Sequence, residues 1–174
     1  YGEDAEVVIE HVNDAGDALH IEQRNPDKQL IIQLDEKLDE AYLEALKTVQ
    51  ENEELASSSD LKVVFTPLHG ASGKTVQRIL NEVGYKHISY VEEQMEPDGD
   101  FPTVESPNPE EQSAFEYAIQ YGERNHADIL IAVDPDGDRV GIAVKSDSKY
   151  ELLTGNQTGA ILIEYLLSQH KAKG

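Results

Sequence analysis

Short apolar runs alternate with amphipathic stretches from residue 61 onward, and this alternation predicts a fold of strands and helices. β-branched and aromatic residues typical of buried strands fill four segments, residues 61–65, 87–91, 129–133 and 140–144. Apolar residues at helical spacing lie between and after them: around residues 76–83, from a predicted cap at Asn108 to Ile119, and from a predicted cap at Asn156 to Leu167.

The order of these segments predicts how the strands pair. Alternating strands and helices indicate right-handed parallel crossovers among the first three strands. The link between the third and fourth strands is too short for a crossover, so those two should form an antiparallel hairpin. We therefore expect an α/β fold of three layers, α/β/α, with a four-stranded mixed sheet whose last strand is antiparallel.

The first 58 residues differ from the rest. An apolar run at residues 7–12 and a brief strand candidate at residues 30–34 precede an amphipathic helix with apolar positions from Leu38 to Val49. We expect two parts, an acidic N-terminal segment over residues 1–58 and an α/β domain over residues 59–174. The chain opens Tyr1-Gly2-Glu3, without Met or a signal peptide, so we also expect a piece of a longer protein.

Composition removes several classes of function. The 35 acidic residues outnumber the 14 basic ones and give a net charge of −21, which would repel nucleic acids and anionic membranes. No apolar run approaches the ~20 residues of a membrane span. The chain has no Cys, which excludes disulfides and thiolate metal sites and is compatible with a reducing compartment.

The densest chemistry is an acidic loop that directly follows the third predicted strand. Asp134, Asp136 and Asp138 alternate with small or rigid residues, and Gly137 permits a tight turn. Two carboxylates ~5 Å apart repel by about 3 kcal/mol at an effective dielectric constant of ~20, so three of them favour a bound cation. Oxygen ligands suit Mg²⁺, and Arg139 adds a planar fork for a phosphate or carboxylate.

Three other interpretations of this loop stay open. The first is a solvated hairpin turn, and the second is a non-catalytic cation-binding or protein-binding module. An EF-hand is disfavoured because Arg139 and Lys145 stand where its Gly and Glu would be. The third is a haloacid-dehalogenase-like phosphotransferase with Asp134 as nucleophile, although Asp138 departs from that family's pattern.

A second candidate follows the first predicted strand, at residues 66–75. A strand-to-helix junction offers free backbone amides to an anion, but small residues there also serve simply to pack helix on strand. Leu68 breaks the Walker A pattern. His69 is either a phosphate contact or a hydrogen-bonded loop histidine, and Ser72 has no neighbouring base in the sequence.

Taken together, these residues resemble the α-D-phosphohexomutase superfamily, which contains phosphoglucomutases and phosphomannomutases. The resemblance spans most of residues 36–167 and rests on the order and spacing of five motifs: TPLHG at 66–70, DGDFP at 98–102, SPNPE at 106–110, DPDGDR at 134–139 and LTGNQ at 153–157. The first and third motifs look most like the branch that includes phosphoglucomutases and phosphopentomutases.

The resemblance implies the second of four domains, preceded by the tail of the first, with strand order 2-1-3-4. Asp134, Asp136 and Asp138 would hold Mg²⁺, while Asp138 and Arg139 would contact the sugar phosphate. The strand order would bring His69 and Gly70 next to the acidic loop, at a point where ligands gather in open sheets.

The reaction that the resemblance implies moves a phosphoryl group between the C1 and C6 (or C5) hydroxyls of a sugar phosphate. It runs through a phosphoserine and a bisphosphate intermediate of the glucose 1,6-bisphosphate type. The phosphoserine motif belongs to the family's first domain and has no match here, so no catalytic residue is expected in this chain and the chain alone should be inactive. The expected partners are a sugar phosphate and the other domains of a cytoplasmic enzyme.

Overall fold

The computed structural model describes residues 2–17, 20, 32 and 34–173 and divides the chain into two units. In the unit of residues 1–35, the helix α1 (Gly2–Asp14) carries the predicted apolar run, and its side chains Val7, Val8, Ile9 and Val12 are exposed. The strand candidate at residues 30–34 falls mostly outside the described residues. The division into an acidic segment over residues 1–58 and an α/β domain over residues 59–174 stays a prediction.

The unit of residues 36–174 is built around a sheet of five strands in the order β2-β1-β3-β4-β5. Its strands are β1 (Lys62–Thr66), β2 (His87–Tyr90), β3 (Ile129–Val133), β4 (Val140–Ser146) and β5 (Lys149–Leu153). β1 is parallel to β2 and β3, and β4 is antiparallel to β3, as predicted. The α/β class is confirmed, but the number of strands was predicted wrongly, because β5 adds an antiparallel fifth strand beside β4.

β5 was not predicted because only two of its five side chains pack against the core. Tyr150 and Leu152 pack against the core from one face, while Lys149 and Glu151 are exposed. The strand pairs with β4 through a two-residue turn in which Asp147 adopts a φ of 54°. A half-buried edge strand of this kind shows only a short alternation of polar and apolar residues.

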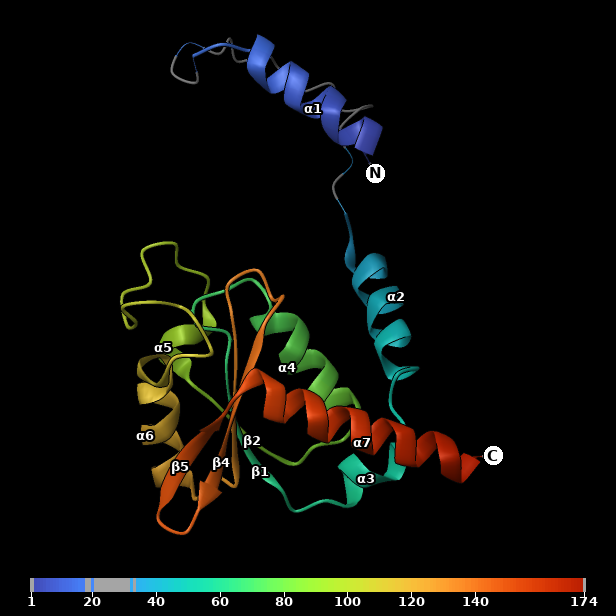
Figure 1. Cartoon of the computed structure of the whole chain (residues 1–174), viewed down its shortest axis with the longest axis vertical. Helices are drawn as coiled ribbons and strands as arrows, with labels where there is room; N and C mark the ends of the chain where they lie inside the picture. Colours follow the sequence, from blue (N-terminus) through green and yellow to red (C-terminus); the bar gives the residue numbers. More distant parts are fainter. Residues whose placement is uncertain (1, 18–19, 21–31, 33, 174) are drawn as a thin grey trace. The chain divides into compact units, whose positions relative to one another are not determined.

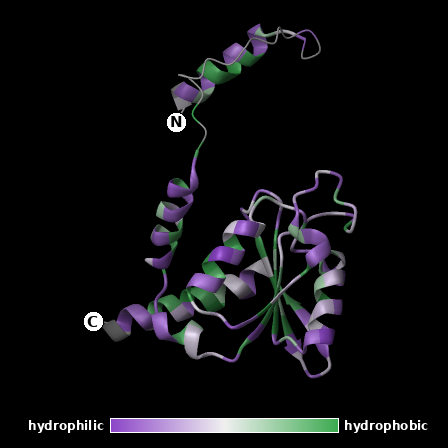
Figure 2. Ribbon diagram, turned by 180° about the vertical axis from the view of Figure 1, so that it is seen from behind, coloured by the Kyte–Doolittle hydropathy of each residue, from purple (hydrophilic) through white to green (hydrophobic). Residues whose placement is uncertain are grey.

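Helices lie on both sides of the sheet, as Figures 1 and 2 show from opposite directions. α5 (Glu92–Met95) and α6 (Glu116–Asn125) lie on one side, and α4 (Gly73–Glu82) and α7 (Gly155–Lys173) lie on the other. The remaining helical segments of this unit are α2 (Glu36–Lys47), α3 (Glu53–Ser58) and the 3-10 turn η2 (Gln112–Phe115).

The core lies between the sheet and α6. It contains fully buried residues of β1, β3 and β4, together with Phe115 and Ala118 from the helical side. β1 is buried along four of its five residues because helices cover both of its faces, which explains its continuous apolar sequence. The sheet therefore provides a rigid support, with the carboxyl ends of β1 and β3 side by side.

Two predicted helix starts were wrong. Asn108 closes a turn through Glu110 and Glu111, and the helical segment begins only at Gln112, because the Asn side chain satisfies the backbone locally. α7 is capped by Thr154 instead of Asn156. Thr154 Oγ1 accepts from Gln157 N (3.2 Å) and Gln157 Oε1 accepts from Thr154 N (2.9 Å), the reciprocal pattern of a capping box.

Across the part of the chain that the structure describes, no helix is both long enough and apolar enough to cross a membrane.

Candidate metal centre

The acidic loop connects β3 to β4 at the carboxyl end of β3. Its two ends are joined by a hydrogen bond from Asp134 N to Arg139 O (3.2 Å), and Gly137 N donates to Asp134 O (3.1 Å). Gly137 adopts a φ of 78°, a left-handed conformation that a residue with a side chain would adopt with strain. The antiparallel pairing of β3 with β4 thus forces residues 134–139 into one compact turn.

This turn gathers the three predicted carboxylates. Asp134, Asp136 and Asp138 each offer one oxygen, and these oxygens all lie within 4.8 Å of one another. Asp134 is 1% exposed, whereas Asp136 and Asp138 face solvent. One carboxylate is therefore held by the protein interior, and two are accessible to a ligand that arrives from solution.

Arg139 binds the buried carboxylate twice. Its backbone N–H donates to Asp134 Oδ1 (3.0 Å), and its side-chain Nε–H donates to Asp134 Oδ2 (2.8 Å). Burial acts to raise the pKa of Asp134, but these hydrogen bonds outweigh it and hold the pKa of that carboxyl below its usual value. The charged form of Asp134 is therefore favoured, and both of its oxygens are held by Arg139.

Asp138 is affected in the opposite direction. A hydrogen bond shared with Asp134 and the charges of Asp136 and Asp134 raise the pKa of Asp138, although Arg139 works against this shift. The proximity of the three carboxylates thus disfavours the charged form of Asp138. A bound cation would remove this conflict, because it would offset the repulsion among all three carboxylates.

The junction between β1 and α4 lies against the acidic loop. Ala71 N donates to Pro135 O (2.9 Å), and a Cβ on Gly70 would lie 2.5 Å from Pro135 Cα. Gly70 therefore packs against the backbone of the acidic loop. The structure also leaves Ser72 Oγ buried without a hydrogen-bond partner among the described residues, beside Gly137.

The side chain of His69 belongs to a buried polar network. His69 is 4% exposed, and its Nε2 lies 2.8 Å from Thr103 Oγ1. Thr103 also accepts from Gln94 Nε2 (2.8 Å), and Gln94 Oε1 accepts from Thr66 Oγ1 (2.6 Å). This network ties β1 to the segment around residues 98–103. Of the two interpretations of His69, the structure favours the hydrogen-bonded loop histidine.

Sequence reasoning missed one side chain that reaches the site. Arg139 Nη1 donates to Asn108 Oδ1 (3.1 Å), although 31 residues separate them. Asn108 lies in the 106–110 motif, but its pattern predicted a helix cap. Gly141 could have indicated this contact, because a glycine within a strand often marks the close approach of another backbone. In the structure, a Cβ on Gly141 would overlap the Pro109 carbonyl.

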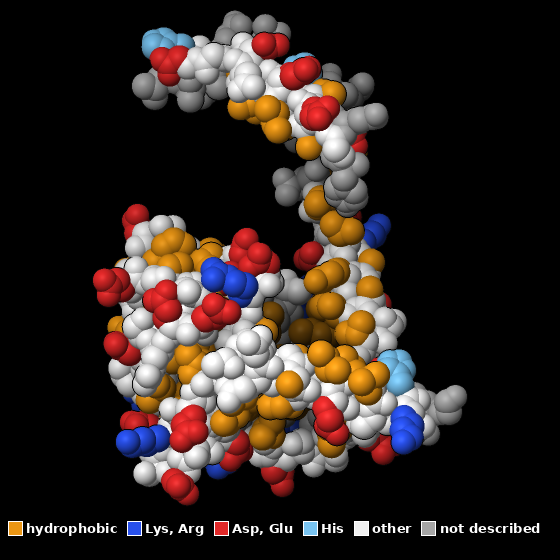
Figure 3. All heavy atoms as spheres, viewed as in Figure 1, with side chains coloured by type: hydrophobic (Ala, Val, Ile, Leu, Met, Phe, Trp, Pro, Cys, Tyr) orange, Lys and Arg blue, Asp and Glu red, His pale blue; other side chains and the backbone are white. Residues whose placement is uncertain are grey.

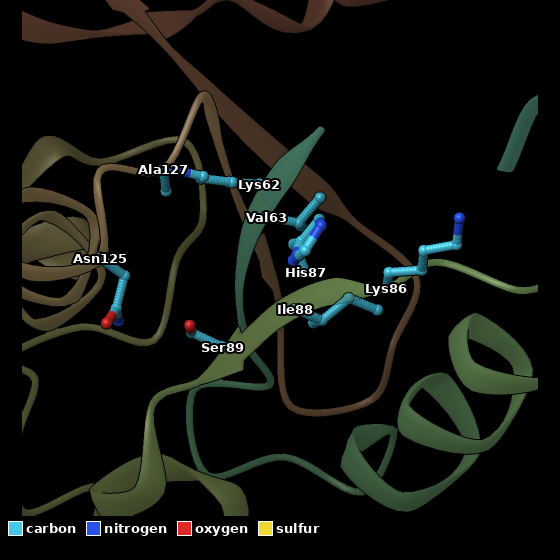
Figure 4. Close-up of a pocket in the computed structure, with 8 residues that line it drawn as sticks. All are labelled: Lys62, Val63, Lys86, His87, Ile88, Ser89, Asn125 and Ala127. Carbon is cyan, nitrogen blue, oxygen red and sulfur yellow. The ribbon is translucent and has the colours of Figure 1, made fainter. Parts of the chain in front are cut away.

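A cavity of about 340 Å³ lies at the other end of the sheet (Figure 4). It is lined by the first residues of β1 and β2, including Lys62 and His87, by Asn125 at the end of α6 and by Ala127 after it. The side chain of Lys86 extends away from it. Since the acidic loop follows the carboxyl end of β3, this cavity is separate from the candidate metal centre.

Comparison with known proteins gives the family. Residues 40–147 match the family described as "Phosphoglucomutase/phosphomannomutase, alpha/beta/alpha domain II". A phosphomannomutase of Mycoplasmoides pirum is 36% identical over 141 residues, covering 81% of this chain and 26% of the relative. A phosphoglucomutase of Staphylococcus aureus is 34% identical over 168 residues, covering 95% of this chain and 30% of the relative. The chain thus spans less than a third of the length of either relative.

A solved structure shows the same fold. A phosphoglucomutase/phosphomannomutase family protein from Burkholderia thailandensis superposes with a TM-score of 0.52 and 24% identity, covering 65% of this chain and 22% of that one. The match to domain II covers the acidic loop, the β1–α4 junction and Asn108 together. The predicted resemblance is confirmed, and the chain belongs to the phosphoglucomutase/phosphomannomutase family.

Proposed function

We propose that this chain is the metal-binding domain of a phosphosugar mutase. The enzyme would move a phosphoryl group between the C1 and C6 (or C5) hydroxyls of a sugar phosphate, through a phosphoserine and a bisphosphate intermediate. The observation that carries the proposal is the convergence of Asp134, Asp136 and Asp138 beside Arg139. The names of the two relatives, a phosphoglucomutase and a phosphomannomutase, support the reaction class.

The donor set fits Mg²⁺. Three carboxylates supply hard oxygen ligands, and the exposure of Asp136 and Asp138 leaves room for water or a phosphate oxygen. Asp134 can accept from Arg139 and still ligate, because an ionised carboxylate offers about four lone-pair sites. When bound, the cation would stabilise the negative charge that develops on the transferring phosphoryl group.

Arg139 is well placed to bind the substrate. Its guanidinium is half-exposed, and two of its nitrogens are engaged by Asp134 and Asn108. Nη2 donates no hydrogen bond to any of the described residues, so its N–H groups can donate to a phosphate. Asp138 lies beside it, with its carboxylate 3.7 Å from Arg139 Nε, and would face the same ligand.

The phosphotransferase alternative, with Asp134 as nucleophile, is disfavoured by the environment of that side chain. Both Asp134 oxygens accept hydrogen bonds from Arg139, and the side chain is only 2% exposed. An attacking carboxylate needs an accessible oxygen aimed at the phosphorus. Asp134 is better suited to anchor a cation than to attack a substrate.

We place the catalytic serine in another domain of the same polypeptide. The apolar residues Ile161, Ile163 and Leu167 of α7 are all more than half exposed, and Figure 3 shows apolar side chains along this helix. A helix that is apolar around its circumference is normally buried, so this surface supports a role within a larger protein. We therefore propose that this chain alone does not isomerise sugar phosphates.

The test is a mutase assay of the full-length polypeptide that contains this chain. We expect it to convert the 1-phosphates of glucose, mannose or a pentose to the corresponding 6- or 5-phosphates, to lose activity in a chelator and to recover it with Mg²⁺. Asp136→Ala should remove most of this activity. Absence of turnover with every one of these substrates, or full activity of Asp136→Ala, would overturn the proposal.

A further inference from the structure

The amide of Asn108 is fixed by three hydrogen bonds. Its Oδ1 accepts from Glu110 N (3.1 Å) and from Arg139 Nη1 (3.1 Å). Its Nδ2 donates to Glu111 Oε1 (2.9 Å), which in turn accepts from Ser106 Oγ (3.3 Å). Because acceptors and donors surround opposite ends of the amide, only one orientation satisfies them all.

The turn that carries Asn108 is docked on the strand that follows Arg139. Pro109 is fully buried, and its carbonyl group contacts Gly141 at the position that a Cβ would occupy. Gly141 belongs to β4 and lies two residues after Arg139. The distance between Asn108 and Arg139 is therefore set by close backbone packing, and does not depend on long, flexible side chains alone.

Asn108 and Asp134 bind different nitrogens of the same guanidinium. Asp134 Oδ2 accepts from Nε–H, and Asn108 Oδ1 accepts from Nη1. A planar group held at two separate nitrogens cannot rotate about either bond, so its orientation is determined. Three N–H groups remain, two on Nη2 and one on Nη1, and they can bind two oxygens of one phosphate.

We infer that Asn108 is a positioning residue for Arg139, which orients the guanidinium so that its free N–H groups meet the phosphate of the substrate. The inference rests on the proposed function in assigning a sugar phosphate to Arg139. The acidic loop alone is then not sufficient. The turn at residues 106–111 must also be folded before Arg139 can bind the phosphate in the correct orientation.

The link between the two side chains can be measured in this chain without substrate. The informative variant is Asn108→Ser, because a Ser hydroxyl can replace the turn hydrogen bond to Glu110 N but is too short to reach Arg139. We expect exchange of the Arg139 Nη1–H protons with water, measured by NMR, to become about tenfold faster, as loss of a hydrogen bond to a charged group implies. Ser106→Ala, which removes a bond in the same turn without touching Arg139, should leave this rate unchanged.

The consequence for function is tested in the full-length polypeptide with a double-mutant cycle. We expect Asn108→Ser to lower kcat/KM for the sugar phosphate about tenfold, mainly through KM, and to add nothing to Arg139→Lys. If Asn108→Ser leaves the Nη1–H exchange unchanged, or if the two substitutions are additive in kcat/KM, the inference is wrong. If Arg139→Lys itself has no effect on kcat/KM, the assignment of Arg139 to the substrate fails instead, whatever the exchange rate shows.

Discussion

Gly70 and Pro135 touch through their backbones, and this contact joins the β1–α4 junction to the acidic loop. A Cβ on Gly70 would lie 2.5 Å from Pro135 Cα and 2.7 Å from Pro135 O, while the next residue, Ala71, donates its N–H to that same oxygen. Pro135 stands between the first two carboxylates of the loop. The shape of the candidate metal centre therefore depends on a residue 65 positions away in the sequence.

Gly70→Ala should displace the acidic loop. Backbone atoms surround the missing Cβ and cannot move as a flexible side chain would, so we expect a loss of about 1–3 kcal/mol in the free energy of unfolding. Cation affinity should fall as well. The control is Gly99→Ala, because a Cβ there meets nothing within 4 Å. Urea unfolding of the two variants measures the difference, and equal stability of the two would contradict the role of this contact.

The three aspartates should differ sharply in their effects on stability. Asp134→Ala removes an ionised, buried acceptor and leaves the Arg139 N–H groups without their partner, so we expect a loss of about 1.5–3 kcal/mol. Asp136→Ala relieves repulsion in the metal-free loop and should leave stability unchanged or higher. Thermal unfolding in the presence of a chelator checks both. A metal-free Asp136→Ala that is markedly less stable than the parent would argue against charge repulsion in the loop.

Arg139→Lys should impair the full-length enzyme although it preserves the charge. Lys lacks the planar fork and the second nitrogen through which Arg139 meets both Asp134 and Asn108. We expect kcat/KM to fall by roughly 10- to 150-fold, the equivalent of about 1.5–3 kcal/mol for hydrogen bonds to a charged group. Steady-state kinetics of Arg139→Lys and Arg139→Ala decide the matter. If the Lys variant keeps the wild-type kcat/KM and only the Ala variant loses it, Arg139 serves only to neutralise the aspartates, and its role as a substrate contact is wrong.

Tyr150 should make stability depend on pH in alkaline solution. Burial, followed by the charges of Asp128 and Glu123, raises the pKa of Tyr150, whose hydroxyl donates to Ala127 O (2.7 Å). The unfolded chain therefore loses this proton first, at about pH 10, and stability falls as the pH rises from there through the folded-state pKa.

Tyr150→Phe separates this effect from the hydrogen bond. Near neutral pH the variant should be less stable by about 0.5–1.5 kcal/mol, because the bond to Ala127 O is lost. Above about pH 10 its stability should fall less steeply than that of the parent, since the titrating group is gone. Urea unfolding as a function of pH provides both values, and parallel pH curves for the two proteins would refute the prediction.

The sequence predicted those parts of the fold in which every side chain contributes to the pattern. β1 is buried along four of its five residues and every residue of β3 is at least partly buried, so their continuous apolar runs identified them within a residue. β5 was missed because only Tyr150 and Leu152 face the core. The start of the helical segment after Asn108 was misplaced because an Asn that caps a helix and one that closes a turn have the same local sequence.

In the candidate site, too, local sequence predicted the contiguous residues but not the contacts between distant loops. Residues 134–139 are contiguous, and charge repulsion among three nearby aspartates could be argued from spacing alone. The contact from Arg139 to Asn108 joins two loops through the packing of Pro109 on Gly141, which depends on tertiary structure. The sequence left the role of His69 open, because its partner Thr103 lies 34 residues away in the chain.

The most direct test of the account is a titration of this chain with Mg²⁺, followed by the backbone NMR signals of residues 134–139. We expect saturable but weak binding, because three carboxylates leave the rest of the coordination to water and we propose that the phosphoserine lies in another domain. The shifts should be confined to the acidic loop and its neighbours Gly70 and Ala71, and Asp136→Ala should abolish them. Shifts that centre elsewhere, or that persist in Asp136→Ala, would contradict the assignment of a cation site to the acidic loop.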